Sequence, residues 1–235
     1  MSESSALPVA FVGNRLGLWP LTCLALTLFW DASGFDITVM SWLADPSGFV
    51  FRDHALLKLV LHDQARLMAW GLLAAVSLSA LFPFGPLKRI PGRDRWVAIT
   101  GILLALLAVG VMKMNSHTSC PWDLDVFGGT AAYVSHWAWL TGDGGPGRCF
   151  PGGHASAGFA FMALAWPWRQ GQRASDRRLG RWILAASLAT GVLFGAVQTI
   201  RGAHYPSHTL WTGLICWAVT WSWYRLAACL PPRRP

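Results

Sequence analysis

The chain has 235 residues, of which 54% are hydrophobic and only 13% are charged, and its formal net charge is +8. This length fits one domain, and the scarcity of charge together with 15 tryptophans argues against a soluble protein, because tryptophan gathers at membrane–water interfaces. Five scattered cysteines are too few for a disulfide scaffold. From the length and composition, we expect residues 1–235 to form a single integral-membrane domain.

Six apolar stretches follow one another along the chain, and each approaches the roughly 20 residues that cross a bilayer core. They are Leu16–Trp30, Leu67–Phe84, Trp96–Met112, His154–Trp168, Trp182–Ile200 and Ser207–Leu226. The first and the fourth are short and must borrow flanking residues. No stretch shows the alternation with a period of two that is typical of strands. The sequence therefore predicts an all-α bundle of six transmembrane helices.

Positive charge gathers in two of the connections and in the tail. These residues are Lys88, Arg89, Arg93, Arg95, then Arg169, Arg173, Arg177, Arg178, Arg181, and finally Arg233 and Arg234. Basic connections stay in the cytoplasm, so both termini are predicted to be cytoplasmic. A basic surface that is divided among such turns is a topology signal and does not indicate nucleic-acid binding. The connections 31–66, 113–153 and 201–206 then face the other side.

The first outer connection carries Lys58, His62 and Arg66 at intervals of four residues, on one stripe of a predicted helix. Two interpretations stay open for this stripe. The basic side chains either extend to the headgroup zone as membrane anchors, or they contact an anionic lipid headgroup.

The second outer connection begins with KMNSHTSCPWDLDVFGG, residues 113–129. Lys113 lies at the outer end of the third stretch, and Cys120, Pro121, Asp123 and Asp125 follow in the loop. His117 and His136 are interpreted as ordinary loop histidines.

The same connection ends with CFPGGHASAGFAF, residues 149–161. Two glycines before a helix leave its first N–H groups unpaired and unobstructed, and such a helix start can bind an anion. His154 stands at this start, where it can give a proton to a bound anion.

The last outer connection reads QTIRGAHYPSHTLW, residues 198–211, and contributes Arg201, His204 and His208. Ionisable groups near a membrane segment are costly, by ~2.5–3.5 kcal/mol for a central arginine or lysine. Anchoring at the membrane interface explains any one of these residues. It explains poorly why they all fall on one side of the membrane, namely Lys113, His154, Arg201, His204 and His208. We therefore expect an anion site there.

These three segments resemble the signature motifs of the type 2 phosphatidic acid phosphatase superfamily, the integral-membrane lipid phosphate phosphatases, and particularly a bacterial membrane branch. Lys113 and Pro121 match the lysine and the proline of the first motif. Residues 151–154, Pro-Gly-Gly-His, match the second motif, and His204 matches the histidine of the third. The resemblance covers residues 113–211.

Four positions depart from the family pattern. Cys120 stands in place of an arginine, Gly152 in place of a serine, Gln198 in place of an arginine and His208 in place of an aspartate.

Other residues can compensate for these departures. Arg201 follows Gln198 by three residues and shares its face on a helix, and Arg148 can replace the arginine of the first motif. The role of the aspartate, which holds the nucleophile's imidazole, falls either to His208 or to a loop carboxylate, Asp123 or Asp125.

The resemblance implies a mechanism and a place in the cell. His204 attacks phosphorus and forms a phosphohistidine, His154 protonates the leaving lipid alcohol, and His208 supports His204. The phosphate is bound by Lys113, Arg201, Arg148 and the backbone N–H groups of Gly152, Gly153 and His154. The scheme requires no metal or other cofactor. The substrate is a lipid phosphomonoester or diphosphate at the periplasmic face of a bacterial inner membrane, and transfer to another lipid instead of water stays open.

Two other functions are considered. His204 and His208 are spaced like a metal-ligand pair on a helix, and His154 can complete a zinc site, although no HExxH glutamate accompanies them and Lys113 and Arg201 would repel a cation. Alternatively, the four departures indicate a protein that binds a lipid phosphate without hydrolysing it.

Cys120 and Cys149 lie in the same outer connection, where a periplasm favours oxidation, and we expect a disulfide between them. Cys23, Cys216 and Cys229 are expected to be ordinary small apolar residues of the helices.

Overall fold

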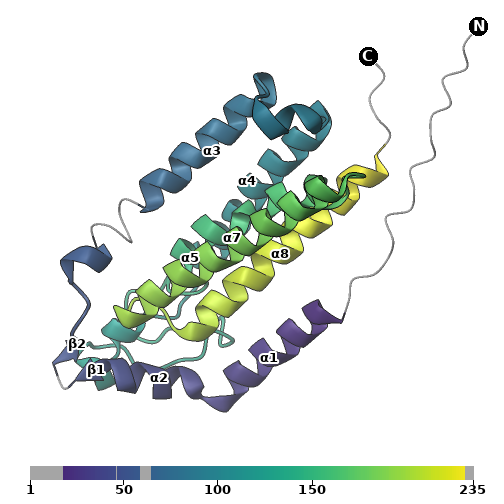
Figure 1. Cartoon of the computed structure of the whole chain (residues 1–235). Coiled ribbons are helices and arrows are strands. Elements are labelled where there is room, and N and C mark those ends of the chain that lie inside the picture. The colour runs from purple at the N-terminus through teal and green to yellow at the C-terminus, as the bar shows by residue number, and fades with distance from the viewer. Residues whose placement is uncertain (1–17, 46, 59–64, 231–235) are drawn as a thin grey trace, which may run out of the picture.

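The computed structural model describes residues 18–45, 47–58 and 65–230. Helices dominate this part of the chain, which confirms the all-α class (Figure 1). The long helices are α1 (Trp19–Ser33), α3 (Ala65–Leu81), α4 (Gly92–Met114), α7 (Ala174–Ile200) and α8 (Pro206–Cys229). The shorter ones are α2 (Phe35–Leu43), α5 (Gly153–Phe159) and α6 (Ala165–Arg169), with 3-10 turns at η2 (Gly85–Arg89), η3 (Pro121–Asp123), η4 (Asp125–Phe127) and η5 (Ala160–Leu164).

All six predicted apolar stretches are helical where the structure describes them, and the differences lie at their ends and breaks. The fifth stretch begins earlier than predicted, because the polar residues from Ala174 onward continue the helix. The fourth stretch is divided into α5, η5 and α6. The first two residues of the stretch Leu16–Trp30 lie outside the described residues.

Membrane crossing is supported for fewer helices than the six predicted. In the described part of the chain, three segments are long and apolar enough to span a bilayer, namely Ala69–Arg89, Gly92–Met114 and Ala174–Ile200. The pair α1–α2 adds a fourth if it counts as one span, and it is bent by 70°. The six-span arrangement and the cytoplasmic termini therefore stay predictions.

The first outer connection contains more regular structure than the sequence indicated. It holds α2 and a two-stranded antiparallel hairpin, β1 (Ala44–Asp45) and β2 (Gly48–Phe49), which the sequence did not indicate. Two-residue strands are too short to show a period of two in the sequence. Lys58 pairs with Asp53 at 3.1 Å, whereas His62 lies outside the described residues.

The core lies between α4, α5, α7 and α8. Ile102 and Val109 of α4 pack there with Phe159 of α5 and Cys216 of α8. Figure 1 shows α7 and α8 side by side, joined by a tight turn at the end of the bundle where α2 and the β1–β2 hairpin also lie. This end of the bundle carries the predicted site.

Candidate active site

Three segments that are distant in sequence meet at this end of the bundle, as predicted. His154 lies in the first turn of α5 and His204 in the turn between α7 and α8, and their ring centroids are 6.4 Å apart. His208, in the first turns of α8, lies 5.9 Å from His204. The side chain of Lys113 comes from the last turn of α4 and runs past Gly153, where an added Cβ would be 3.4 Å from the lysine Cδ.

His204 is buried, with only 4% of its surface exposed. Its Nδ1 lies 3.4 Å from the sulfur of Cys149. Burial lowers the pKa of His204 well below its ordinary value of 6.5, and the neighbouring positive charges of Lys113 and His154 lower it further. The imidazole is therefore neutral at neutral pH, which is the form that can act as a nucleophile.

His208, which stands where the third motif of the family has an aspartate, is completely buried. Its Nδ1 lies 3.1 Å from the carbonyl oxygen of Cys149. The two carboxylates that we considered as substitutes bond elsewhere: Asp123 accepts from the indole N–H of Trp122, and Asp125 accepts from the backbone N–H of Val126. Among the described residues, no carboxylate contacts His204, and His208 is the predicted substitute that lies beside it.

Arg201 is held rigidly at the edge of the site. It is 5% exposed, its Nε donates to the carbonyl of Arg52 at 2.9 Å, and a terminal nitrogen donates to Oε1 of Gln198 at 3.3 Å. Gln198 thus orients the arginine that follows it by one helical turn. The guanidinium of Arg52 lies 4.7 Å from the ring centroid of Trp122, and that of Arg201 lies 5.9 Å from it. Sequence reasoning missed Arg52, because no motif distinguishes it from other loop arginines.

Two predicted phosphate ligands are placed differently from expectation. Arg148 adopts a left-handed conformation with φ of 58°, its side chain is exposed, and its backbone N–H donates to Ser116. The N–H of Gly152 was expected to face the phosphate, but it already donates to the carbonyl of His208 at 3.4 Å. This hydrogen bond forms because the first turns of α8 pack directly on residue 152.

The predicted disulfide between Cys120 and Cys149 is present, with an S–S distance of 2.12 Å. It fastens the first motif segment to the second, beside His204. Cys23, Cys216 and Cys229 are free, as expected.

The spacing of ligand atoms does not favour the zinc site of three histidines. In the described part of the chain, the group with ligand atoms close enough for one metal ion consists of Cys120, Cys149 and His204, within 4.8 Å. Its two sulfurs are joined in the disulfide, so they are not thiolate ligands.

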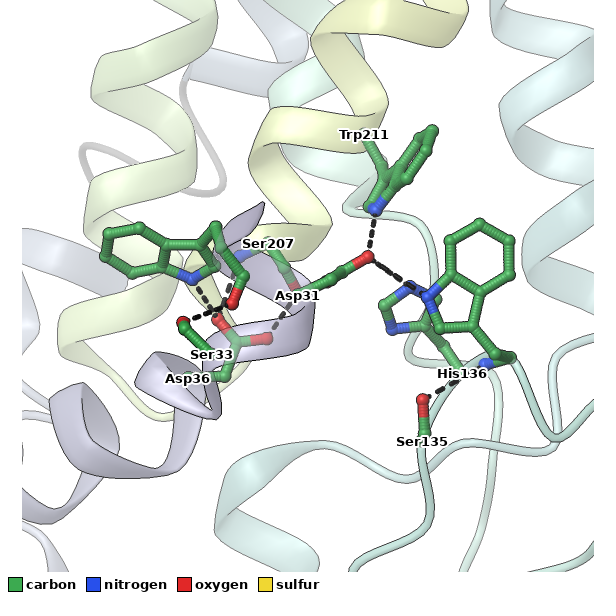
Figure 2. Close-up of polar contacts among 9 residues, drawn as sticks. Asp31, Ser33, Asp36, Ser135, His136, Ser207 and Trp211 are labelled. Atoms are coloured by element: carbon green, nitrogen blue, oxygen red, sulfur yellow. Dashed lines mark hydrogen bonds and ion pairs between the residues drawn. The ribbon is translucent and has the colours of Figure 1, made fainter. Parts of the chain in front are cut away.

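His136 lies inside the site, although the sequence indicated an ordinary loop histidine. Its ring stacks on Phe150, with centroids 4.2 Å apart, and meets the ring of His208 edge-on at 5.5 Å. Its Nε2 lies 3.2 Å from Oδ2 of Asp31, at the end of α1 (Figure 2). No local pattern could have revealed this pair, since the two residues are far apart in the sequence.

Comparison with protein-family models shows a match to the PAP2 superfamily over residues 94–229. Comparisons with curated proteins and with solved structures give no significant match. The matched region runs from the first turn of α4 to the end of α8, so it contains all three motif segments and leaves α1–α3 outside. Because this region is more than half of the chain, the protein belongs to the PAP2 superfamily.

Proposed function

We propose that this protein is a membrane lipid phosphatase that works through a phosphohistidine on His204. Members of the PAP2 superfamily are generally phosphatases that act on phosphoric esters, and the apolar helices fit a lipid substrate. The observation that carries the proposal is the pair of imidazoles 6.4 Å apart, with Lys113 and Arg201 at the same end of the bundle. Reacting atoms approach to about 3–3.5 Å, so this separation suits one phosphoryl group between the rings.

In the first step, a ring nitrogen of His204 attacks phosphorus. Because Nδ1 faces the sulfur of Cys149, Nε2 is the nitrogen that remains for the attack. The N–P bond forms as the bond from phosphorus to the lipid oxygen breaks, and protonated His154 gives its proton to that oxygen. Lys113 and Arg201 bind the equatorial oxygens, on which the negative charge is spread.

In the second step, water replaces the imidazole on phosphorus. His154 is now neutral and takes a proton from the water as the new P–O bond forms and the N–P bond breaks. Phosphate leaves, and His204 returns to its neutral form. We place this reaction at the periplasmic face of a bacterial inner membrane, where an oxidising environment suits the Cys120–Cys149 disulfide.

The nucleophile is tested by His204→Ala in purified protein with chelator present. Phosphate release from a panel of lipid phosphomonoesters and diphosphates should fall by more than about 10³-fold, as for other enzymes that lose their nucleophile. The acid-labile phosphoenzyme should disappear at the same time. His117→Ala is the matched control, because His117 is an exposed histidine of the same outer connection, and it should turn over like the wild type.

Undiminished release by His204→Ala would contradict the nucleophile assignment. If the wild type binds the lipid phosphates but releases no phosphate, the alternative of a non-catalytic binding protein is favoured. The absence of a carboxylate at His204 among the described residues supports this alternative.

A further inference from the structure

Two buried carboxylates lie at the corner between α1 and α2, outside the region that the family model matches. Asp31 has a side chain that is 7% exposed, and its Oδ2 accepts hydrogen bonds from the indole N–H of Trp211 at 2.6 Å and of Trp137 at 3.1 Å. Asp36 accepts from the indole of Trp30, and from the backbone and hydroxyl of Ser207 at the start of α8 (Figure 2). Both carboxylates therefore meet the helix that carries His208.

Only Asp31 is linked to the histidines. The same Oδ2 lies 3.2 Å from Nε2 of His136, whose side chain is 8% exposed. Phe150 stacks on one face of the His136 ring and also meets the ring of His208 at 5.2 Å. His136 itself meets His208 edge-on at 5.5 Å. A continuous set of packed rings thus runs from Asp31 to His208, which lies 5.9 Å from the nucleophile.

We propose that Asp31 is a positioning residue of this active site: through His136 it fixes His208, and so it supplies from α1 the negative charge that the third motif lacks. The inference rests on the proposed function of His204. Its physical reason is that a carboxylate partner fixes the orientation and the tautomer of an imidazole. Asp31 is such a partner for His136, and the ring of His136 packs edge-on against that of His208. In the third motif, His208 stands where the family has an aspartate, whose carboxylate would fix the imidazole of the nucleophile.

The test separates the charge of Asp31 from its tethering of α1 to α8. Asp31→Asn keeps an oxygen that can accept from the two indoles but removes the charge. Trp211→Phe keeps the charge but removes one donor of the tether. We expect kcat to fall by about 10- to 100-fold in Asp31→Asn, the range known for outer partners of metal-ligating histidines. KM should change little, because the side chain of Asp31 is buried and only 7% exposed. Trp211→Phe should keep a kcat close to that of the wild type.

A second variant, His136→Gln, tests the same contact if Asp31→Asn does not fold. His136→Gln should lose as much kcat as Asp31→Asn, and the double variant should lose no more than either, because both act through one contact. Any one of three results would overturn the inference. These are an unchanged kcat in folded Asp31→Asn, an equal loss of kcat in Trp211→Phe, or additive losses of kcat in the double variant.

A readout without turnover separates this inference from the proposed function. In protein labelled with ¹⁵N-histidine, which has seven histidines, Asp31→Asn should shift the ring signals of His136 and His208, and Trp211→Phe should leave them in place. If the wild type releases no phosphate from any lipid, the proposed function fails. Shifted signals would then still support the positioning by Asp31, and unshifted ones would overturn it.

Discussion

His204, the proposed nucleophile, is kept neutral by its surroundings. Desolvation is the largest contribution to the low pKa of His204, and Lys113 and His154 add to it. An unfolded chain exposes the same imidazole to water, where its pKa is about 6.5. The unfolded state therefore takes up a proton that the folded state does not accept at that pH.

This difference predicts how stability depends on pH. The contribution of His204 to the free energy of unfolding is fully present above about pH 6.5 and is lost as the pH falls below it. The melting temperature in detergent should therefore drop from about pH 7 to about pH 5, and His204→Gln should make the slope shallower. His117→Ala, which removes an exposed histidine, should keep the wild-type slope. An equal slope in His204→Gln and wild type would contradict this explanation.

The position of α5 depends on two glycines where α5 and α7 touch. A Cβ added to Gly158 would lie 2.3 Å from the backbone nitrogen of Gly191, and one added to Gly191 would lie 2.3 Å from the ring of Phe159. These close approaches allow α5 to lie directly against α7. Since α5 begins with the residues of the second motif, the same contact sets where His154 stands relative to the α7–α8 turn.

Gly158→Ala should therefore destabilise the protein by about 1–3 kcal/mol, the usual cost of an overpacked core. It should also lower phosphate release, because α5 must move. Gly110→Ala is the matched control: an added Cβ in α4 meets nothing within 4 Å, so alanine should stabilise the helix by about 0.5–1 kcal/mol. Thermal unfolding in detergent measures both changes, and equal melting temperatures for the two variants would contradict the packing explanation.

At the scale of the whole molecule, the basic connections predict the orientation in the membrane. Arg169 and Arg173 flank the turn between α6 and α7, which should stay in the cytoplasm, whereas the connection between α4 and α5 should face the periplasm. The two faces can be distinguished with single cysteines at exposed positions in a background without the three free cysteines.

Leu140→Cys, in the connection between α4 and α5, should react with an impermeant maleimide in intact bacterial cells. Gln172→Cys, in the turn between α6 and α7, should react only after the cells are permeabilised. The reverse pattern would place the histidines on the cytoplasmic side and remove the periplasmic assignment.

The sequence alone determined the helical elements and the family of this protein. Hydropathy is a local property, so each of the six apolar stretches appears as helix over most of its described length. The three motifs have fixed residue types at fixed spacing, so they indicated the family, the convergence of His154 and His204, and a lysine, Lys113, close to His204. The Cys120–Cys149 bond could also be predicted, because both cysteines lie in one outer connection next to motif residues.

Only the tertiary structure decided what depends on long-range packing. Nothing in the local sequence indicates that the chain turns by 70° between α1 and α2, that the N–H of Gly152 is used by α8, or that His136 is buried. The contact between Asp31 and His136 joins residues far apart in the sequence, and such a contact exists only because separate helices and loops pack against each other. Burial and the pairing of buried polar groups are properties of that packing, so the residues around His204 could not be predicted from the motif that contains it.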